Sequence, residues 1–366
     1  MKFSINQNEL QSALSVVAKA SSSRASLPIL SGVMVKAEAE RVTLEATDLT
    51  VSTRCALPAL VEEEGEAVLP ATLFLNVVKK LPNAAIHLKT DQDCATVLCD
   101  TTSVSLKTFT AQDFPGFPIV QEEESTTLPF DLFARMVRKV ERVVAVDEMR
   151  PVLTGVLVEV AEDKLKLVAT DSYRLSIMEA PHENTGQPFK AVIPGAFLKE
   201  VSSLPQGEEN IHIGYNENQI LITYGTYTFI NRRIEGTYPD YNQLIPKSCT
   251  TKATIETKKL IDAVDRTSLL SNKTTPVKFD LNIASQTMHV STSNADVGAA
   301  SDTVGAEITG EDIEIAFNFS FVLDGLRAAE SSTIDLELEN SQRPGIFKTS
   351  GDEQYTYLVM PVRIPQ

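Results

Sequence analysis

The sequence repeats itself at an interval of 123 or 124 residues, and this interval constrains the fold more than any other feature. Thr47, Thr170 and Ser293 are 123 residues apart, and each lies near the end of a run in which apolar and polar residues alternate. A second landmark keeps the register at 124: Pro70, Pro194 and Asn318. Because several landmarks recur in order, we interpret the chain as three diverged copies of one unit. The expected domains are residues 1–122, 123–248 and 249–366.

Each copy has the pattern of an α+β domain. A stretch with apolar residues at helical spacing comes first, as at 131–144, where Leu132, Met136, Val140 and Val143 recur. Alternating strands such as GVLVEV and KLKLVAT follow, and a second helix is expected after the proline landmark. Short turns between the strands favour antiparallel pairing. The sequence therefore predicts an α+β protein with six helices, roughly two dozen strands and mainly antiparallel sheets.

The composition suits a cytoplasmic protein with more than one hydrophobic core. Apolar residues make up 43% of the 366 positions. No apolar run is long enough to span a bilayer, and the N-terminal residues lack the pattern of a signal peptide. The four cysteines form neither a CxxC pair nor a disulfide framework. We therefore expect a cytoplasmic location.

The distribution of charge indicates a basic surface made by helices. The net charge is −16, yet basic side chains outnumber acidic ones in the six expected helices. Arg135, Arg138 and Arg142 fall on one face of the first helix of the second copy. For one helix alone, a solvated face with ion pairs between turns explains such residues. A shared sign in all three copies favours a common surface that faces something negative.

The width of a helix shows how many copies could surround a nucleic acid. Six helices of about 10 Å each, placed side by side, make a ring with a hole under about 10 Å. Twelve make a circumference of roughly 120 Å and a hole near 28 Å. A B-form duplex is roughly 20 Å across. One chain therefore could not enclose DNA, whereas two could.

Several spaced motifs make the sequence resemble one family over essentially its whole length. They are the N-terminal MKF, LPIL, the paired ATD strands, ATDSYRL, YPDY at 238–241, LLSN at 269–272, FN at 317–318 and VMPVRI. The chain looks like the bacterial sliding clamp, the beta subunit of DNA polymerase III. The resemblance implies the DNA-clamp fold in a head-to-tail homodimer, with six domains around duplex DNA. It also implies that the ring tethers the replicative polymerase, confers processivity and is opened by a separate ATP-driven loader.

In that family, a pocket at a strand end receives short linear motifs from polymerases and other clamp-binding proteins. The resemblance carries this role to Leu153, Thr170, Ser172, Tyr173, Arg174, Leu175, Pro239, Leu244, Asn318, Met360, Pro361, Val362 and Arg363. Apolar members can hold the anchors of an extended peptide, while Arg174 and backbone groups orient it. Ser172 and Tyr173 stand where glycine and histidine are frequent, and Gln243 where a basic residue is frequent. For TDSYRL taken alone, a structural turn is the simpler alternative.

The resemblance also assigns a DNA surface and a dimer seam. Arg24 matches a family position that faces the hole. By face and charge, the helices add these candidates: Lys79, Lys80, Arg135, Arg138, Arg142 and Lys199. Their contacts should be made to phosphates, without base readout, because a clamp must slide. The seam falls on Leu73, Phe74, Val104 and Leu106 against Leu269 and Leu270. Each of these six could equally be a core side chain.

No catalytic or cofactor motif stands out. The sequence contains neither GxxxxGK[ST] nor GxGxxG after a strand, and its four histidines are far apart. Asp48 and Asp171 recur with the repeat, which fits a structural turn better than catalysis. We therefore expect a protein that is not an enzyme and holds no metal or cofactor. The alternative is an acidic carbohydrate-binding or scaffolding repeat protein, for which the lack of tryptophan is unfavourable.

Overall fold

The computed structural model describes residues 1–22, 27–147, 149–183, 188–205, 207, 209–246, 248–271, 275–349 and 354–363. Arg24, which the resemblance assigned to the DNA surface, lies outside the described residues, as do the C-terminal Pro365 and Gln366. Within the described ranges there are six α-helices and 25 strands, which confirms the expected α+β class. None of the helices that the structure describes is long and apolar enough to cross a membrane.

The three copies share one order of elements, namely strand, helix, four strands, helix, three strands. The first copy, which inserts one extra short strand, comprises β1 (Lys2–Asn6), α1 (Gln7–Val17), β2 (Gly32–Glu38), β3 (Arg41–Thr47), β4 (Val51–Pro58), β5 (Leu60–Glu63), β6 (Gly65–Pro70), α2 (Ala71–Lys80), β7 (Ala85–Asp91), β8 (Cys94–Cys99) and β9 (Thr102–Lys107). The second comprises β10 (Glu124–Pro129), α3 (Phe130–Val140), β11 (Gly155–Val160), β12 (Lys164–Thr170), β13 (Arg174–Pro181), β14 (Phe189–Pro194), α4 (Gly195–Ser202), β15 (Asn210–Tyr215), β16 (Gln219–Tyr224) and β17 (Tyr227–Arg232). The third comprises β18 (Thr251–Glu256), α5 (Thr257–Ser268), β19 (Val277–Asn282), β20 (Thr287–Asn294), β21 (Gly298–Thr309), β22 (Ile313–Phe317), α6 (Phe319–Ala329), β23 (Thr333–Leu338), β24 (Gly345–Lys348) and β25 (Gln354–Val359). The protein is therefore a three-domain α+β fold with two helices in each domain.

The second landmark of the repeat has a structural meaning. Pro70, Pro194 and Asn318 are the N-cap residues of α2, α4 and α6. Proline has its φ fixed near the value that a helix start requires, and it has no N–H to leave unpaired. Asn318 instead accepts a hydrogen bond from the backbone N–H of Ser320 through its side-chain oxygen, 2.9 Å away. Both solutions begin the second helix at the same place.

All pairings between the described strands are antiparallel, as the short turns predicted. The strands form three sheets, ordered β5-β1-β7-β8-β9, β10-β15-β16-β17-β4-β3-β2-β6 and β14-β11-β12-β13-β25-β24-β23-β18-β21-β20-β19-β22. Two of these sheets run from one repeat into the next. The fourth strand of the first repeat, β4, pairs with β17, which is the last strand of the second repeat. In the same way β13 pairs with β25 of the third repeat.

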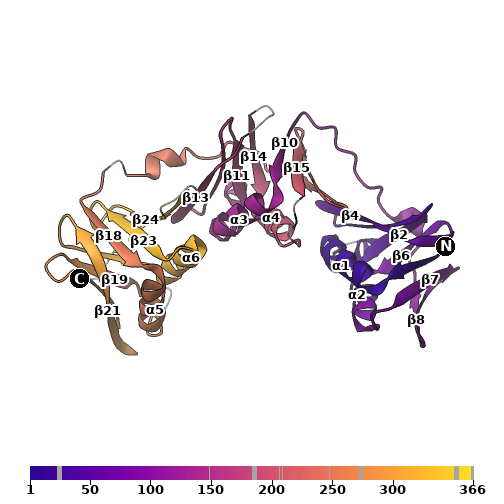
Figure 1. Cartoon of the computed structure of the whole chain (residues 1–366), viewed down its shortest axis with the longest axis horizontal. Helices are drawn as coiled ribbons and strands as arrows, with labels where there is room; N and C mark the ends of the chain where they lie inside the picture. Colours follow the sequence, from indigo (N-terminus) through magenta and orange to yellow (C-terminus); the bar gives the residue numbers. More distant parts are fainter. Residues whose placement is uncertain are drawn as a thin grey trace. The chain divides into compact units, whose positions relative to one another are not determined.

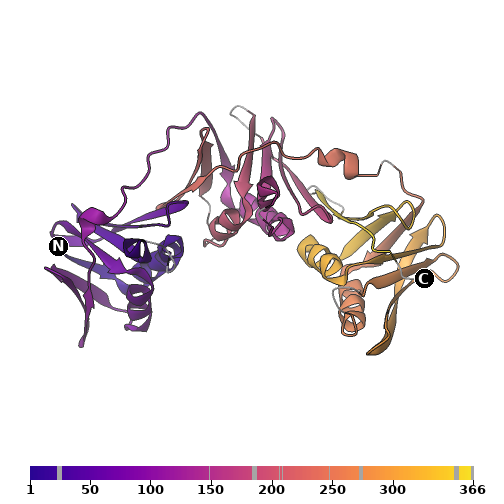
Figure 2. The same cartoon turned by 180° about the vertical axis from the view of Figure 1, so that it is seen from behind.

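This sharing of strands divides the chain into two compact units at a place that the repeat did not predict. One unit is Met1–Phe130 with Leu204–Arg233, and the other is Asp131–Ser203 with Ile234–Gln366. The second repeat contributes to both because its two halves join the sheets of different neighbours. Figures 1 and 2 show α1 beside α2 in the first unit and α5 beside α6 in the second, and each pair is in contact.

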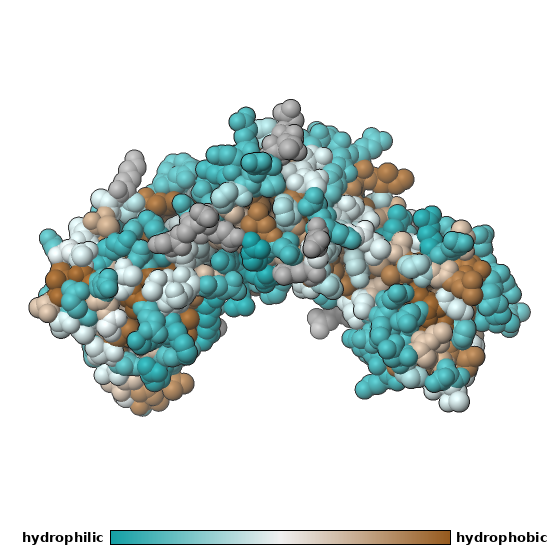
Figure 3. Space-filling model, viewed as in Figure 1, coloured by the Kyte–Doolittle hydropathy of each residue, from teal (hydrophilic) through white to brown (hydrophobic). Residues whose placement is uncertain are grey.

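The helices bury one face each against their sheets. In α3 the fully buried side chains recur at helical spacing: Phe130, Phe133, Ala134, Met136, Val137 and Val140. The helix predicted over 131–144 ends at Val140 and continues as a short 3₁₀ helix, Glu141–Val143, and Leu132 is only half-buried. On the face drawn in Figure 3, hydrophilic residues predominate and apolar ones form scattered small groups.

Candidate functional site

The repeated ATD sequence forms the same turn twice. In the second repeat, the Asp171 carboxylate accepts hydrogen bonds from the backbone N–H groups of Tyr173 and Arg174, at 2.9 and 3.0 Å. The hydroxyl of Thr170 donates to the Arg174 carbonyl at 2.7 Å and accepts from the Ser172 N–H at 3.1 Å. Thr47 and Asp48 make the corresponding bonds in the first repeat. Both aspartates are therefore turn residues, as expected.

The turn requires a left-handed backbone at its third residue. Ser172 has a φ of +78° and Leu49, its counterpart, has a φ of +73°. This region favours glycine because a Cβ crowds the following carbonyl. The geometry therefore fits the glycine that the resemblance leads us to expect at this position. Ser172 is exposed and its hydroxyl accepts a hydrogen bond from Arg150 at 3.0 Å.

Arg174 lies at the centre of a buried network. Its Nε donates to Asp171 at 3.0 Å and one terminal nitrogen donates to Asp324 of α6 at 2.5 Å. The other terminal nitrogen donates to the Arg142 carbonyl at 3.0 Å, and the guanidinium stacks 4.4 Å from the Phe321 ring centroid. The side chain is about nine-tenths buried. It therefore holds the start of β13 against α6 and the 3₁₀ helix, a role that the sequence did not show.

An apolar cluster lies beside this turn, on the same sheet. It consists of Leu157, Val168, Leu175, Ile177, Val192, Tyr241 and Leu358, all buried, with Val152, Ile234, Tyr238 and Ile245 packed against it. The Tyr238 hydroxyl donates to the Val168 carbonyl at 3.3 Å, and the Tyr241 hydroxyl donates to Glu159 at 3.4 Å. Burial raises the pKa of Tyr238, and burial together with the nearby Glu159 carboxylate raises the pKa of Tyr241. Both phenols therefore stay neutral, and their hydrogen bonds hold the two rings against the apolar cluster.

Large apolar side chains around this cluster remain exposed to solvent. Tyr173 is 65% exposed, Leu244 44%, Met360 38% and Val362 37%. The backbone N–H of Met360 donates to the Tyr173 carbonyl at 2.9 Å, and that of Val362 donates to the Ala316 carbonyl at 2.8 Å. A cavity of about 660 Å³ lies beside this segment, lined by Ile315, Ala316, Ser341, Gln342, Met360, Pro361, Val362 and Arg363. We call the cluster, this rim and the cavity together the docking groove, after the role proposed for them below.

The residues that the resemblance assigned to this site differ in how far they are exposed to solvent. Leu153, Thr170 and Leu175 are buried below the surface. Asn318 caps α6 through its side-chain oxygen. The more accessible members are Ser172, Tyr173, Pro239, Leu244, Met360, Pro361, Val362 and Arg363.

Sequence reasoning missed most of the buried apolar cluster, which we call the floor of the docking groove. The missed residues include Leu157, Val168, Ile177, Tyr241 and Leu358. The signal was present in β12 and β13, where Val168 and Ile177 interrupt the alternation with apolar residues on the outer face. Strands buried on both faces lose their alternation in this way.

The basic candidates on the helices have different surroundings. Lys79 and Lys80 are exposed at the end of α2. Lys199 of α4 lies 3.5 Å from Glu141, and the same glutamate lies 3.8 Å from Arg142. Arg138 is exposed and Arg135 half-buried, on the face of α3 opposite its core. The solvated face with ion pairs, offered as the alternative for a single helix, therefore applies in part.

The six candidates for the dimer seam also divide. Leu269 is 81% exposed and Leu73 51%, and Val104 and Leu270 are half-buried. Phe74 and Leu106 are buried in the core of the first unit, so their side chains present little surface. The core alternative therefore describes Phe74 and Leu106, while the other four remain available for contact.

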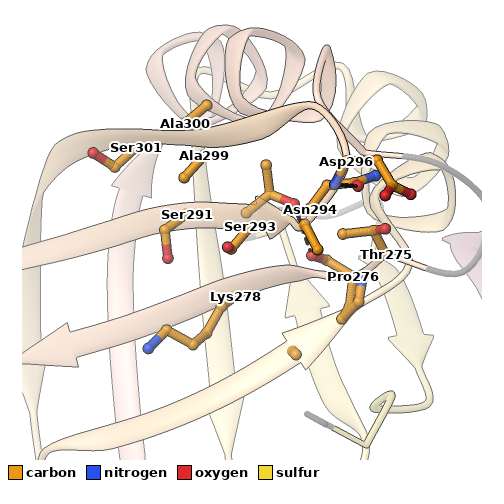
Figure 4. Close-up of a pocket in the computed structure, with 13 residues that line it drawn as sticks. Thr275, Pro276, Lys278, Ser291, Ser293, Asn294, Asp296, Ala299, Ala300 and Ser301 are labelled. Carbon is orange, nitrogen blue, oxygen red and sulfur yellow. Dashed lines mark hydrogen bonds between the residues drawn. The ribbon is translucent and has the colours of Figure 1, made fainter.

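A second cavity, of about 730 Å³, lies over β19, β20 and β21 (Figure 4). Small hydroxyl-bearing side chains line much of it, including Thr275, Ser291, Ser293 and Ser301. Lys278, also at its wall, is paired with Glu314 at 2.9 Å. A lining of this kind offers little to an apolar peptide anchor. Among the residues that the structure describes, no group of histidine, cysteine or carboxylate side chains could hold a metal ion.

The chain matches one protein family along its length. Residues 1–118 match the N-terminal domain of the DNA polymerase III beta subunit, residues 127–240 its central domain and residues 242–363 its C-terminal domain. The beta sliding clamp of Synechocystis sp. is 33% identical over 389 residues, which cover 100% of both chains.

Solved structures show the same likeness in three dimensions. The DNA polymerase sliding clamp of Bacillus subtilis has a TM-score of 0.92 and 30% identity, with 100% of both chains covered. The Pseudomonas aeruginosa sliding clamp bound to griselimycin has a TM-score of 0.92 and 25% identity, again with 100% of both chains covered.

Proposed function

The chain belongs to the DNA polymerase III beta subunit family, and from its place among these non-catalytic sliding clamps we propose how it acts. Two copies join head to tail and enclose duplex DNA, and the docking groove tethers the replicative polymerase. The clamp loader and other proteins that carry short clamp-binding motifs use the same groove.

The pairing of strands between neighbouring repeats is the observation that best supports a head-to-tail dimer. The fourth full-length strand of one repeat pairs with the last strand of the next, as β4 does with β17 and β13 with β25. In the third repeat, the corresponding strand is β21, whose residues 298–305 pair with β20 on one side only in the described structure. In the first repeat, β9 ends its sheet. The rule therefore directs β21 of one copy to β9 of another, and Leu269, Leu270, Leu73 and Val104 would lie near that seam.

Contacts to DNA are made to phosphates by the basic side chains of the helices. Such contacts neutralise backbone charge without reading bases, so the ring can move along the duplex. The topological link can be tested by loading the clamp onto nicked circular DNA with its loader. We expect the loaded clamp to remain bound at high salt and to be lost when the circle is cut to a linear form. Loss from the intact circle at the same rate would contradict encirclement.

The docking groove takes an extended peptide with apolar anchors. The exposed rim of Tyr173, Leu244, Met360 and Val362 around a buried apolar floor supports this role. Griselimycin, which the Pseudomonas aeruginosa clamp binds, serves as the probe.

We expect Leu175→Ala and Met360→Ala each to weaken griselimycin binding, since both remove apolar surface from the groove. Calorimetry measures the affinity. Leu60→Ala, at an exposed leucine of β5, is the matched control and should bind as the unmodified protein does. Because Leu175 is buried, thermal unfolding of that variant is measured in parallel. Unchanged affinity in both groove variants would remove the assignment.

A further inference from the structure

We propose that the first repeat contains a closed copy of the docking groove, sealed by ion pairs to the buried carboxylate of Glu45, and that this closure limits each chain to one groove. The inference rests on the docking groove proposed above. It assigns to Glu45, Ser52, Arg54 and Phe117 the role of excluding a peptide from the first repeat.

The two repeats build the same backbone at this place. In the second repeat Leu157 pairs with Val168, Val168 with Ile177, and Leu175 with Leu358. In the first repeat Met34 pairs with Glu45, Glu45 with Arg54, and Ser52 with Ile230. The strands β3 and β12 even share one burial pattern along all seven residues. Every residue of the groove floor on these strands therefore has a defined counterpart.

At three of these positions, apolar residues of the second repeat are polar or charged in the first. Glu45 replaces Val168, Arg54 replaces Ile177 and Ser52 replaces Leu175. The remaining positions are apolar in both repeats. The first repeat has Met34, Val68 and Ile230 where the second has Leu157, Val192 and Leu358, respectively. In the first-repeat copy, the three central floor positions are therefore polar or charged, whereas the positions at its margins remain apolar.

Each of the polar replacements has a hydrogen-bond or ion-pair partner within the first repeat. Glu45 is 2% exposed, and its carboxylate lies 2.7 Å from an Arg54 nitrogen and 3.2 Å from the Lys36 ammonium. The Arg54 Nε donates a second bond to the same glutamate at 2.7 Å. The hydroxyl of Ser52 lies 2.8 Å from that of Thr47. A buried carboxylate with several charge-assisted bonds is stable in place and costly to leave unpaired.

A phenylalanine covers the ion pair. The Arg54 guanidinium stacks 3.9 Å from the ring centroid of Phe117. In the sequence, FPGF at 114–117 stands where the second repeat has YPDY at 238–241. Tyr241 packs into the apolar cluster of the groove, whereas Phe117 closes over a cation. A peptide anchor entering here would have to displace Arg54 and so remove one of the two cations that pair with Glu45, a loss for which an apolar side chain offers no compensation.

The test counts griselimycin molecules bound per chain by calorimetry, on the full-length protein. We expect one for the unmodified chain and two for Glu45→Val/Ser52→Leu/Arg54→Ile, which restores the apolar floor. In a Leu175→Ala/Met360→Ala background, the same three substitutions should restore one site, with affinity at least about ten-fold above that background. Thermal unfolding checks that each variant is folded.

A reciprocal variant keeps the inference testable if the triple variant does not fold. Val168→Glu/Ile177→Arg should abolish griselimycin binding, while the volume-conserving Val168→Ile/Ile177→Val should retain it. A folded triple variant that still binds one molecule, or a reciprocal variant that binds as the unmodified chain does, overturns the closure. An unmodified chain that binds none refutes the docking groove itself, so the two failures are distinguishable.

Discussion

At the scale of single residues, the repeated Thr–Asp turn shows how one backbone solution survives while its surroundings diverge. The threonine and aspartate make the same hydrogen bonds in both copies, and both turns place a residue other than glycine at a left-handed φ. That conformation costs a residue with a Cβ about 1 kcal/mol or more. The hydrogen bonds of the threonine and aspartate therefore hold a backbone conformation that the residue at the third position does not favour.

Ser172→Gly tests the strain directly. We expect it to stabilise the second unit by about 0.5 kcal/mol, because relief of the left-handed strain exceeds the entropy that glycine adds to the unfolded chain. Equilibrium unfolding in urea measures the change. Ser293→Gly, at an exposed strand position of the same unit, should instead destabilise by about 0.5–1 kcal/mol. A destabilising Ser172→Gly would show that the serine hydroxyl matters more than its backbone.

The sequence predicted the turn but not the hydrogen-bond partners of every residue in it. Thr170 and Asp171 act locally, so a short stretch of sequence contains all their partners. Arg174 reaches Asp324, which is 150 residues away, and no local pattern could reveal that pair. For the same reason, Val168 and Ile177 could be assigned to the apolar cluster only once the pairing of their strands was known.

At the scale of elements, Arg174 joins a strand, a helix and a 3₁₀ helix. Its nitrogens donate to Asp171, Asp324 and the Arg142 carbonyl, so removing the arginine would leave three acceptors without their donor. Breaking a buried ion pair by removing one partner commonly costs about 3–5 kcal/mol.

We therefore expect Arg174→Ala to destabilise the second unit by about 3 kcal/mol, discounted to the lower limit because Asp324 is partly exposed. Arg174→Lys should also destabilise, since one ammonium cannot reproduce the planar fork. Chemical unfolding gives both values. Arg150→Ala, at an exposed arginine that hydrogen-bonds to Ser172 of the same turn, should change stability by less than about 0.5 kcal/mol. Equal effects at the two arginines would argue against the network.

The order of elements was predictable, and the division into compact units was not. Helical spacing and strand alternation within one repeat specify local structure, so the helices and antiparallel strands agree with expectation. Pairing of β4 with β17 and of β13 with β25 depends on strand edges that no periodicity marks. The expected boundaries at residues 122 and 248 remain predictions.

At the scale of the whole molecule, the proposed seam makes the oligomer sensitive to a single charge. We expect Leu269→Asp to convert the dimer to monomer, because a carboxylate at an apolar contact would be buried without a partner. Sedimentation velocity reports the mass. Leu60→Asp, on the edge strand β5 at the other end of the first sheet, should leave the dimer intact. A dimeric Leu269→Asp protein would place the seam elsewhere.

The basic helices predict how binding to DNA responds to salt. Lys79→Ala should lower the slope of log affinity against log salt by about 1, since one phosphate contact releases about one counterion. Fluorescence anisotropy with a short duplex measures the slope, and the loss should be the same for any base sequence. Lys89→Ala, on strand β7, is the control and should leave the slope unchanged. A sequence-dependent loss would contradict a sliding contact.

Sheets that cross from one repeat into the next have a mechanical consequence. A force along the chain is borne at those crossings by rows of hydrogen bonds together with the covalent backbone, so neither joint can separate completely. The proposed seam between β21 and β9 has the hydrogen bonds without the backbone. Under load, we expect such a closed assembly to yield at its seams and re-form there, so that opening the proposed ring breaks no pairing within either chain.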